Sequence, residues 1–157
     1  MILQGSSPIY PIFAAVMIAL SILLIPRKYY QYIFPNIFAG TLIVFVILYL
    51  ASSVINAWKY TYAEPFAFAG VPIFILLAWG GAFAIFLWGL PANLPVWTHY
   101  IYIAMFAIVG IMLDDLFHDL GLRPYASWYS AWMWFFPMFL TFWINYTLYK
   151  KLKKLEK

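Results

Sequence analysis

The sequence predicts an all-α integral membrane protein, a single domain over residues 1–157 with about five transmembrane helices. Sixty-seven per cent of its residues are apolar and only 9% are charged, whereas soluble domains contain about 25% charged residues. A soluble fold of 157 residues cannot bury that much apolar surface, because small folds keep a large fraction of their surface exposed. The aromatic content of 23% also fits residues near lipid headgroups, where Trp and Tyr accumulate.

The apolar stretches give the predicted spans, since a span needs about 20 such residues. Pro35 is compatible with the first turn of a helix, Gly121 suits the position just after a helix end, and Pro137 predicts a kink. The connections are short, so consecutive helices are expected to be antiparallel neighbours. The five predicted spans cover residues 9–25, 35–55, 66–88, 96–120 and 128–149.

The basic residues predict the orientation of the bundle. Five of the nine form a C-terminal run, Lys150, Lys151, Lys153, Lys154 and Lys157. An outside N-terminus puts this run in the cytoplasm together with Arg27 and Lys28, and leaves only Lys59 and Arg123 outside. The positive-inside rule favours this arrangement, which describes a multi-pass protein of the cell membrane with membrane lipid as a partner. The run simply ends an apolar helix and is not interleaved with aromatic or polar residues, so no nucleic-acid partner is expected.

An acidic cluster at the end of the fourth span is the main candidate site. Asp114, Asp115, His118 and Asp119 cover about 140° of one helix face at 100° per residue. Their carboxylates repel one another and lie at the negative end of the helix dipole. A bound cation, protonation of one acid, pairing with a basic residue such as Arg123, or water must therefore compensate them.

Three interpretations of this cluster follow. It is a solvated cap beyond the membrane boundary, or a protonation or substrate site that faces the bundle interior, or a divalent-metal site built from Asp115, His118 and Asp119. No cofactor other than that divalent cation is expected. The absence of cysteine excludes thiolate catalysis and Cys-ligated metal sites.

Aromatic residues between the second and third spans form a second candidate site. One interpretation is an interfacial belt of Trp and Tyr. The other is the mouth of a pocket in which aromatic faces hold a polyene or a carbocation, while Glu64 supplies or removes a proton. Trp79 and Trp132 would line the same pocket, although their spacing fits ordinary packing equally well. The residues of this second site are Asn56, Trp58, Lys59, Tyr60, Tyr62 and Glu64.

Several short motifs follow one another within residues 56–140. They are Trp58-x-Tyr60-x-Tyr62, Gly70-Val71-Pro72-Ile73, Leu77-Ala78-Trp79, Asp115-Leu116-Phe117-x-Asp119, and an aromatic helix with Trp128, Trp132 and Pro137. In this order they resemble the integral-membrane carotenoid hydratases and the related membrane lycopene cyclases. That group adds or removes water or protons at double bonds of long isoprenoids, using acidic side chains and no redox cofactor.

The resemblance implies roles for particular residues. Asp115 and Asp119 would be the acidic groups, and Trp58, Tyr60, Tyr62, Trp79 and Trp132 would line the polyene site. Phe74 and Ile75 stand where the cyclases carry paired glutamates, which is a departure from the pattern of that group.

The resulting hypothesis is a non-redox lyase or isomerase that modifies an isoprenoid or carotenoid by acid–base chemistry in a lipid-accessible pocket. Its candidate catalytic residues are Asp114, Asp115, His118, Asp119 and Glu64. The alternatives are a non-catalytic subunit or assembly factor of a larger membrane complex, or a small transporter or channel subunit that forms a homo-oligomer. The enzyme hypothesis requires a cavity that reaches Asp115 and Asp119, whereas the subunit hypothesis predicts a filled bundle.

Overall fold

The computed structural model describes residues 7–91 and 94–155, and these residues form five α-helices. The mostly helical fold predicted from the sequence is thus confirmed over these residues, while Lys157 of the basic run lies outside them. The elements are α1 (Ile9–Leu24), α2 (Arg27–Tyr49) with a π-helical turn at Leu50–Val54, β1 (Ala67–Phe68), β2 (Val71–Pro72), α3 (Ile73–Trp88), α4 (Val96–Asp119), a 3-10 turn at Ala131–Trp134, and α5 (Phe135–Leu155).

Prolines and residues with positive φ decide where two of the helices begin. Pro26 has an extended backbone with ψ 136°, and α2 begins directly after it at Arg27, so Pro35 lies inside the helix rather than in its first turn. Before α3, Ala69 and Gly70 have φ of 51° and 77° and turn the chain into the β1–β2 hairpin. The third helix therefore begins at Ile73, after Pro72, and not at residue 66.

The last two helices differ in how closely they follow the predicted spans. Helix α4 begins at Val96 as predicted and ends at Asp119, one residue before the predicted end, and Gly121 adopts φ 69° just beyond it, as expected for a helix C-terminus. Helix α5 begins later than predicted, at Phe135. Pro137 therefore falls in its first turn, where the missing N–H costs no intrahelical hydrogen bond, so the residue gives no reason for a kink.

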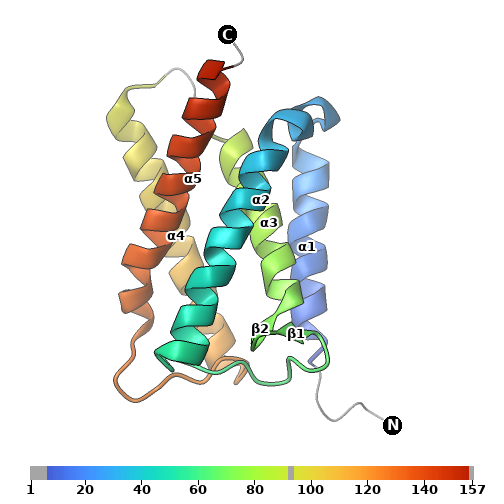
Figure 1. Ribbon diagram of the computed structural model, residues 1–157, viewed down its shortest axis with the longest axis vertical. Helices are drawn as coiled ribbons and strands as arrows, with labels where there is room; N and C mark the ends of the chain where they lie inside the picture. The colour runs from blue at the N-terminus through green and yellow to red at the C-terminus, as the bar shows by residue number, and fades with distance from the viewer. Residues whose placement is uncertain (1–6, 92–93, 156–157) are drawn as a thin grey trace.

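The helices run up and down along the long axis of the molecule, and their connections lie at its two ends (Figure 1). Helix α3 packs between α1 and α2, and α5 packs against α2 and α4. Among consecutive helices, α2 pairs with α3 and α4 pairs with α5, whereas α1 and α2, and also α3 and α4, are not closely packed pairs. Two of the four consecutive helix pairs are therefore closely packed along their backbones.

Helices α3 and α4 meet through aromatic side chains near one end. The ring of Phe86 on α3 lies 5.4 Å from that of Tyr102 and 5.2 Å from that of Phe106 on α4. Toward the other end, where the chain enters α3 and leaves α4, the two helices leave a space between them. That space holds the site described below.

Two helical segments are long and apolar enough to cross a membrane, Arg27–Val54 and Val96–Asp119. Helices α1 and α3 are apolar but shorter, with 16 residues each. Large apolar side chains cover the outside of the bundle, for example Leu23 at 81% exposed and Met112 at 66% exposed. A surface of this kind is compatible with contact with lipid.

Candidate functional site

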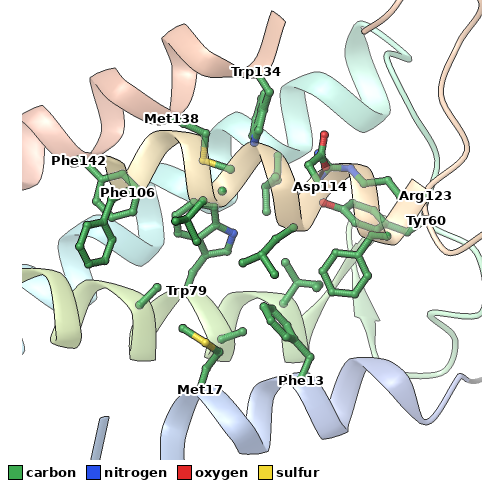
Figure 2. Close-up of a pocket in the computed structure, with 18 residues that line it drawn as sticks. Phe13, Met17, Tyr60, Trp79, Phe106, Asp114, Arg123, Trp134, Met138 and Phe142 are labelled. Atoms are coloured by element: carbon green, nitrogen blue, oxygen red, sulfur yellow. Dashed lines mark hydrogen bonds and ion pairs between the residues drawn. The ribbon is translucent and has the colours of Figure 1, made fainter. Parts of the chain in front are cut away.

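An apolar cavity of about 110 Å³ lies between α1 and α3 on one side and α4 and α5 on the other. Figure 2 shows its polar side chains gathered at one end, where Asp114, Arg123 and Tyr60 lie together, while the rest of the wall is apolar. The labelled apolar residues come from α1 (Phe13, Met17), α3 (Trp79), α4 (Phe106), the 3-10 turn (Trp134) and α5 (Met138, Phe142).

A buried ion pair forms the polar end of the cavity. Arg123 Nη1 donates a hydrogen bond to Asp114 Oδ1, and the two side chains are 7% and 1% exposed, respectively. The second carboxylate oxygen of Asp114 accepts a hydrogen bond of 2.9 Å from the Tyr125 hydroxyl. Removing two charges from water is costly, and only close pairing with further hydrogen bonds offsets that cost. Both oxygens of Asp114 are therefore occupied by protein donors.

The turn after α4 brings Arg123 back to Asp114. The N–H of Gly121 donates to the carbonyl of His118 at 2.8 Å, and the N–H of Leu122 donates to the carbonyl of Phe117 at 2.9 Å. These two bonds close the helix end in the way that a glycine with positive φ allows. The reversal places Arg123, nine residues after Asp114 in the sequence, beside the interior face of α4.

The guanidinium of Arg123 lies against aromatic rings. It is 3.6 Å from the ring centroid of Trp58, 5.3 Å from that of Tyr60 and 5.5 Å from that of Trp134. These are distances at which a cation is attracted to the face of a ring. Asp114 and three aromatic rings thus together hold the cation in the bundle.

Four buried hydrogen-bond donors on the residues that line the cavity have no partner among the described residues. They are Nε and Nη2 of Arg123, the hydroxyl of Tyr60 and Nε1 of Trp134. Burial raises the pKa of Tyr60 above its ordinary value, and the Arg123 cation opposes that shift only in part. The Tyr60 hydroxyl is therefore protonated at neutral pH and available as a donor.

Two loops form a cap over this end of the bundle, made of residues 57–61 and 122–126. The N–H of Lys59 donates to the Pro124 carbonyl at 3.2 Å, and the N–H of Ala126 donates to the Ala57 carbonyl at 2.8 Å. From α1, the Tyr10 hydroxyl donates to the Leu122 carbonyl at 2.7 Å. This loop cap fixes the position of Arg123 relative to the helices.

The structure separates the acidic cluster into an inner and an outer part. Asp114 is buried and lines the cavity, whereas Asp115, His118 and Asp119 are exposed and do not line it. The His118 ring stacks on Tyr125 at 4.0 Å, and its Nδ1 lies 3.3 Å from the Arg123 carbonyl oxygen. His118 thus packs against the loop cap from outside. Among the described residues, no group of three or more His, Asp or Glu side chains is placed to hold a metal ion.

The second candidate site is also divided. Tyr60 and Trp79 line the cavity, while Trp58 is buried behind the guanidinium of Arg123. Tyr62 and Trp132 are 60% and 67% exposed. Glu64 is exposed in the loop before β1 and does not reach the cavity.

Sequence reasoning named Arg123 as one possible partner of the acidic cluster but did not include it among the site residues, and it missed Tyr125 and Trp134. Arg123 and Lys59 were also the two basic residues that the predicted orientation left outside. The burial of Arg123 beside Asp114 gives it a structural reason to be there. Tyr125 and Trp134 carried no comparable signal among so many aromatic residues.

Comparison with protein-family models, with curated proteins and with solved structures gives no significant match to this chain. Its function is therefore argued from the geometry of the cavity.

Proposed function

We propose that this chain is a five-span membrane protein that binds a lipid-soluble molecule of the isoprenoid type in its cavity. The observation that carries this proposal is the combination of an apolar wall with one polar end that contains unpaired donors. Small-molecule sites are typically mostly apolar with a few convergent polar groups that fix the orientation of the ligand.

The side-by-side arrangement of the helices along one axis supports five spans. Two segments are long and apolar enough to cross a bilayer, and the other helices run beside them with all connections at the two ends (Figure 1). A bilayer crossed by α2 and α4 would therefore contain α1, α3 and α5 at the same depth. Helices α1 and α3 are about 24 Å long at 1.5 Å per residue, and local thinning of the bilayer accommodates short spans at modest cost.

Single cysteines test this topology, because the chain contains none of its own. Ser127 lies in the loop between α4 and α5, and Leu94 lies in the loop between α3 and α4. With the N-terminus outside, a membrane-impermeant maleimide added to intact cells labels Ser127→Cys, while Leu94→Cys reacts only after the cells are opened. Labelling of both, or the reverse pattern, would contradict the proposed topology.

The shape of the cavity supports an elongated ligand. Asp114 and Phe106 both line it from α4, and eight residues of helix correspond to about 12 Å. Val109 also lines the cavity and is 53% exposed, so the cavity reaches the lipid-facing surface of α4. A hydrophobic molecule would enter from the bilayer there and place its polar end beside Arg123.

Acid–base chemistry on the bound molecule is a second candidate function. The Tyr60 hydroxyl and the Asp114 carboxylate lie at the same end of the cavity, which puts a proton donor and an acceptor next to a bound double bond or oxygen. In this form of the proposal Tyr60 and Asp114 take the roles that the family resemblance implied for Asp115 and Asp119. Conversion of the bound isoprenoid by the wild type but not by Tyr60→Phe would support it.

Filling the cavity tests binding itself. Ala82 lines the cavity, so Ala82→Phe should occupy the ligand space and abolish the binding of farnesol to the detergent-solubilised protein, measured by native mass spectrometry. Ala15 is exposed on α1 and does not line the cavity, so Ala15→Phe is a matched control that should bind like the wild type. Equal binding by all three proteins would contradict the proposal and favour the role of a non-catalytic membrane subunit.

A further inference from the structure

We propose that the ligand carries a neutral carbonyl oxygen, which accepts hydrogen bonds from Arg123 and Tyr60. This inference rests on the proposed function, because it names the chemistry of the molecule that the cavity binds. The polar oxygen lies at the loop cap, and the apolar chain extends along α4 toward Phe106 and Phe142.

The first argument is the number of donors that lack a partner. Nε and Nη2 of Arg123 and the hydroxyl of Tyr60 are buried and donate no hydrogen bond to any described residue. The Arg123 residue is 6% exposed, and Arg123 and Tyr60 both line the cavity. A buried donor without an acceptor has lost its bonds to water and gained nothing in return. An acceptor on the ligand would restore them.

The second argument is charge. Asp114 already neutralises Arg123 through the buried ion pair, so the polar end of the cavity has no net charge. A carboxylate or phosphate would bring a further negative charge close to Asp114 and leave it without a cation of its own. Burial of an uncompensated charge is much more costly than burial of a neutral polar group. The pair therefore favours a neutral head.

The third argument separates a carbonyl from a hydroxyl. The unpaired Arg123 nitrogens can only donate, and each oxygen of Asp114 already accepts one bond, from Arg123 or from Tyr125. A hydroxyl head would have to share an Asp114 oxygen with one of these donors, or give its proton to the Tyr60 oxygen, and Tyr60 could then not donate to the head. A carbonyl oxygen has two lone pairs and no proton to place, so it accepts from Arg123 and Tyr60 together and leaves no donor of its own unpaired.

A series of ligands with one chain and different heads tests this assignment. The probes are methyl farnesoate, farnesol, farnesoic acid and farnesene, with affinities for the wild type measured by native mass spectrometry in one detergent. We expect methyl farnesoate to bind about tenfold more tightly than farnesene, because hydrogen bonds from a charged donor are the stronger ones. Farnesol and farnesoic acid should bind more weakly than the ester.

Each other outcome has a defined meaning. Equal affinity for the ester and farnesene would overturn the carbonyl assignment while leaving the apolar cavity as a binding site. Tightest binding of farnesoic acid would show an anion site, and tightest binding of farnesol would show a hydroxyl site; both would overturn the inference. Binding of no member of the series would count against the proposed function itself.

Two tyrosine variants locate the effect in the structure. Tyr60→Phe removes one donor from the cavity and should weaken the binding of methyl farnesoate about fivefold to tenfold, with farnesene unchanged. Tyr129 also has a buried hydroxyl without a partner among the described residues, but it does not line the cavity. Tyr129→Phe should therefore bind both probes like the wild type. An equal loss in the two variants, or no loss in Tyr60→Phe, would overturn the role of Tyr60.

Discussion

Helix α3 meets α1 and α4 in opposite ways. Against α1 it packs closely at Gly81, where a Cβ atom would lie only 2.8 Å from the carbonyl oxygen of Met17. Against α4 it has aromatic contacts near one end, through Phe86, and a cavity toward the other. Small residues allow helices to approach closely in membranes, whereas large rings hold them apart. The comparison shows that side-chain size along α3 decides where the bundle is closed and where it is open.

On the side of α3 that faces α4, the Arg123–Asp114 ion pair forms one end of the cavity. The loop cap, the turn at Gly121 and three aromatic rings all position this pair. The ion pair thus holds the elements together at this end of the cavity, as the close contact at Gly81 holds α3 against α1. Variants of the Arg123–Asp114 pair and of the Gly81 contact test whether these two contacts contribute differently to stability.

The largest expected effect comes from breaking the ion pair. Arg123→Met leaves Asp114 buried without its cation, which should lower the free energy of unfolding by about 3–5 kcal/mol. Thermal unfolding in detergent micelles would measure the loss. The double variant Arg123→Met/Asp114→Leu should recover most of it, because the uncompensated charge is gone. A double variant as unstable as the single one would show that lost packing, not charge, causes the effect.

A smaller loss is expected where α3 touches α1. Gly81→Ala puts a methyl group against the backbone of Met17, with the carbonyl carbon at 2.9 Å, and backbone cannot turn away as a side chain can. Overpacking of this kind typically costs about 1–3 kcal/mol. The same thermal unfolding measurement applies. A variant as stable as the wild type would mean that α1 shifts freely and is not fixed against α3.

The sequence predicted α4 and its end well because both signals are local. Continuous apolar residues set the helix, and Gly121 supplies the positive φ that ends it. It did not predict the start of α3, because Phe66 to Pro72 is as apolar as a span and yet forms a hairpin, with the turn set by the positive φ of Ala69 and Gly70. Composition alone does not distinguish an apolar hairpin from the first turns of an apolar helix.

The acidic cluster shows a second limit of the sequence. Its residues cover an arc of about 140°, and the sequence gives that arc but not which edge of it faces the interior. Packing against α5 and the loop cap places Asp114 inside and leaves Asp115 and Asp119 exposed. The partner Arg123 follows a glycine turn, whose direction depends on contacts with the distant loop at residues 57–61. Long-range contacts of this kind leave no local pattern.

The smallest expected effect is at Gly110, the glycine of α4 that lines the cavity. A Cβ atom there would lie 3.0 Å from Cε and 3.1 Å from Sδ of Met138, which are the far end of a flexible side chain beside free space. Methionine adapts readily to such changes, so Gly110→Ala should change the free energy of unfolding by less than about 1 kcal/mol. Gly110→Ala is thus the matched partner of Gly81→Ala, since each adds one methyl group to an apolar helix of the bundle. Equal losses in the two variants would remove the distinction between a closed and an open side of α3, because the methyl group on the open side would then meet the same resistance as the one against α1.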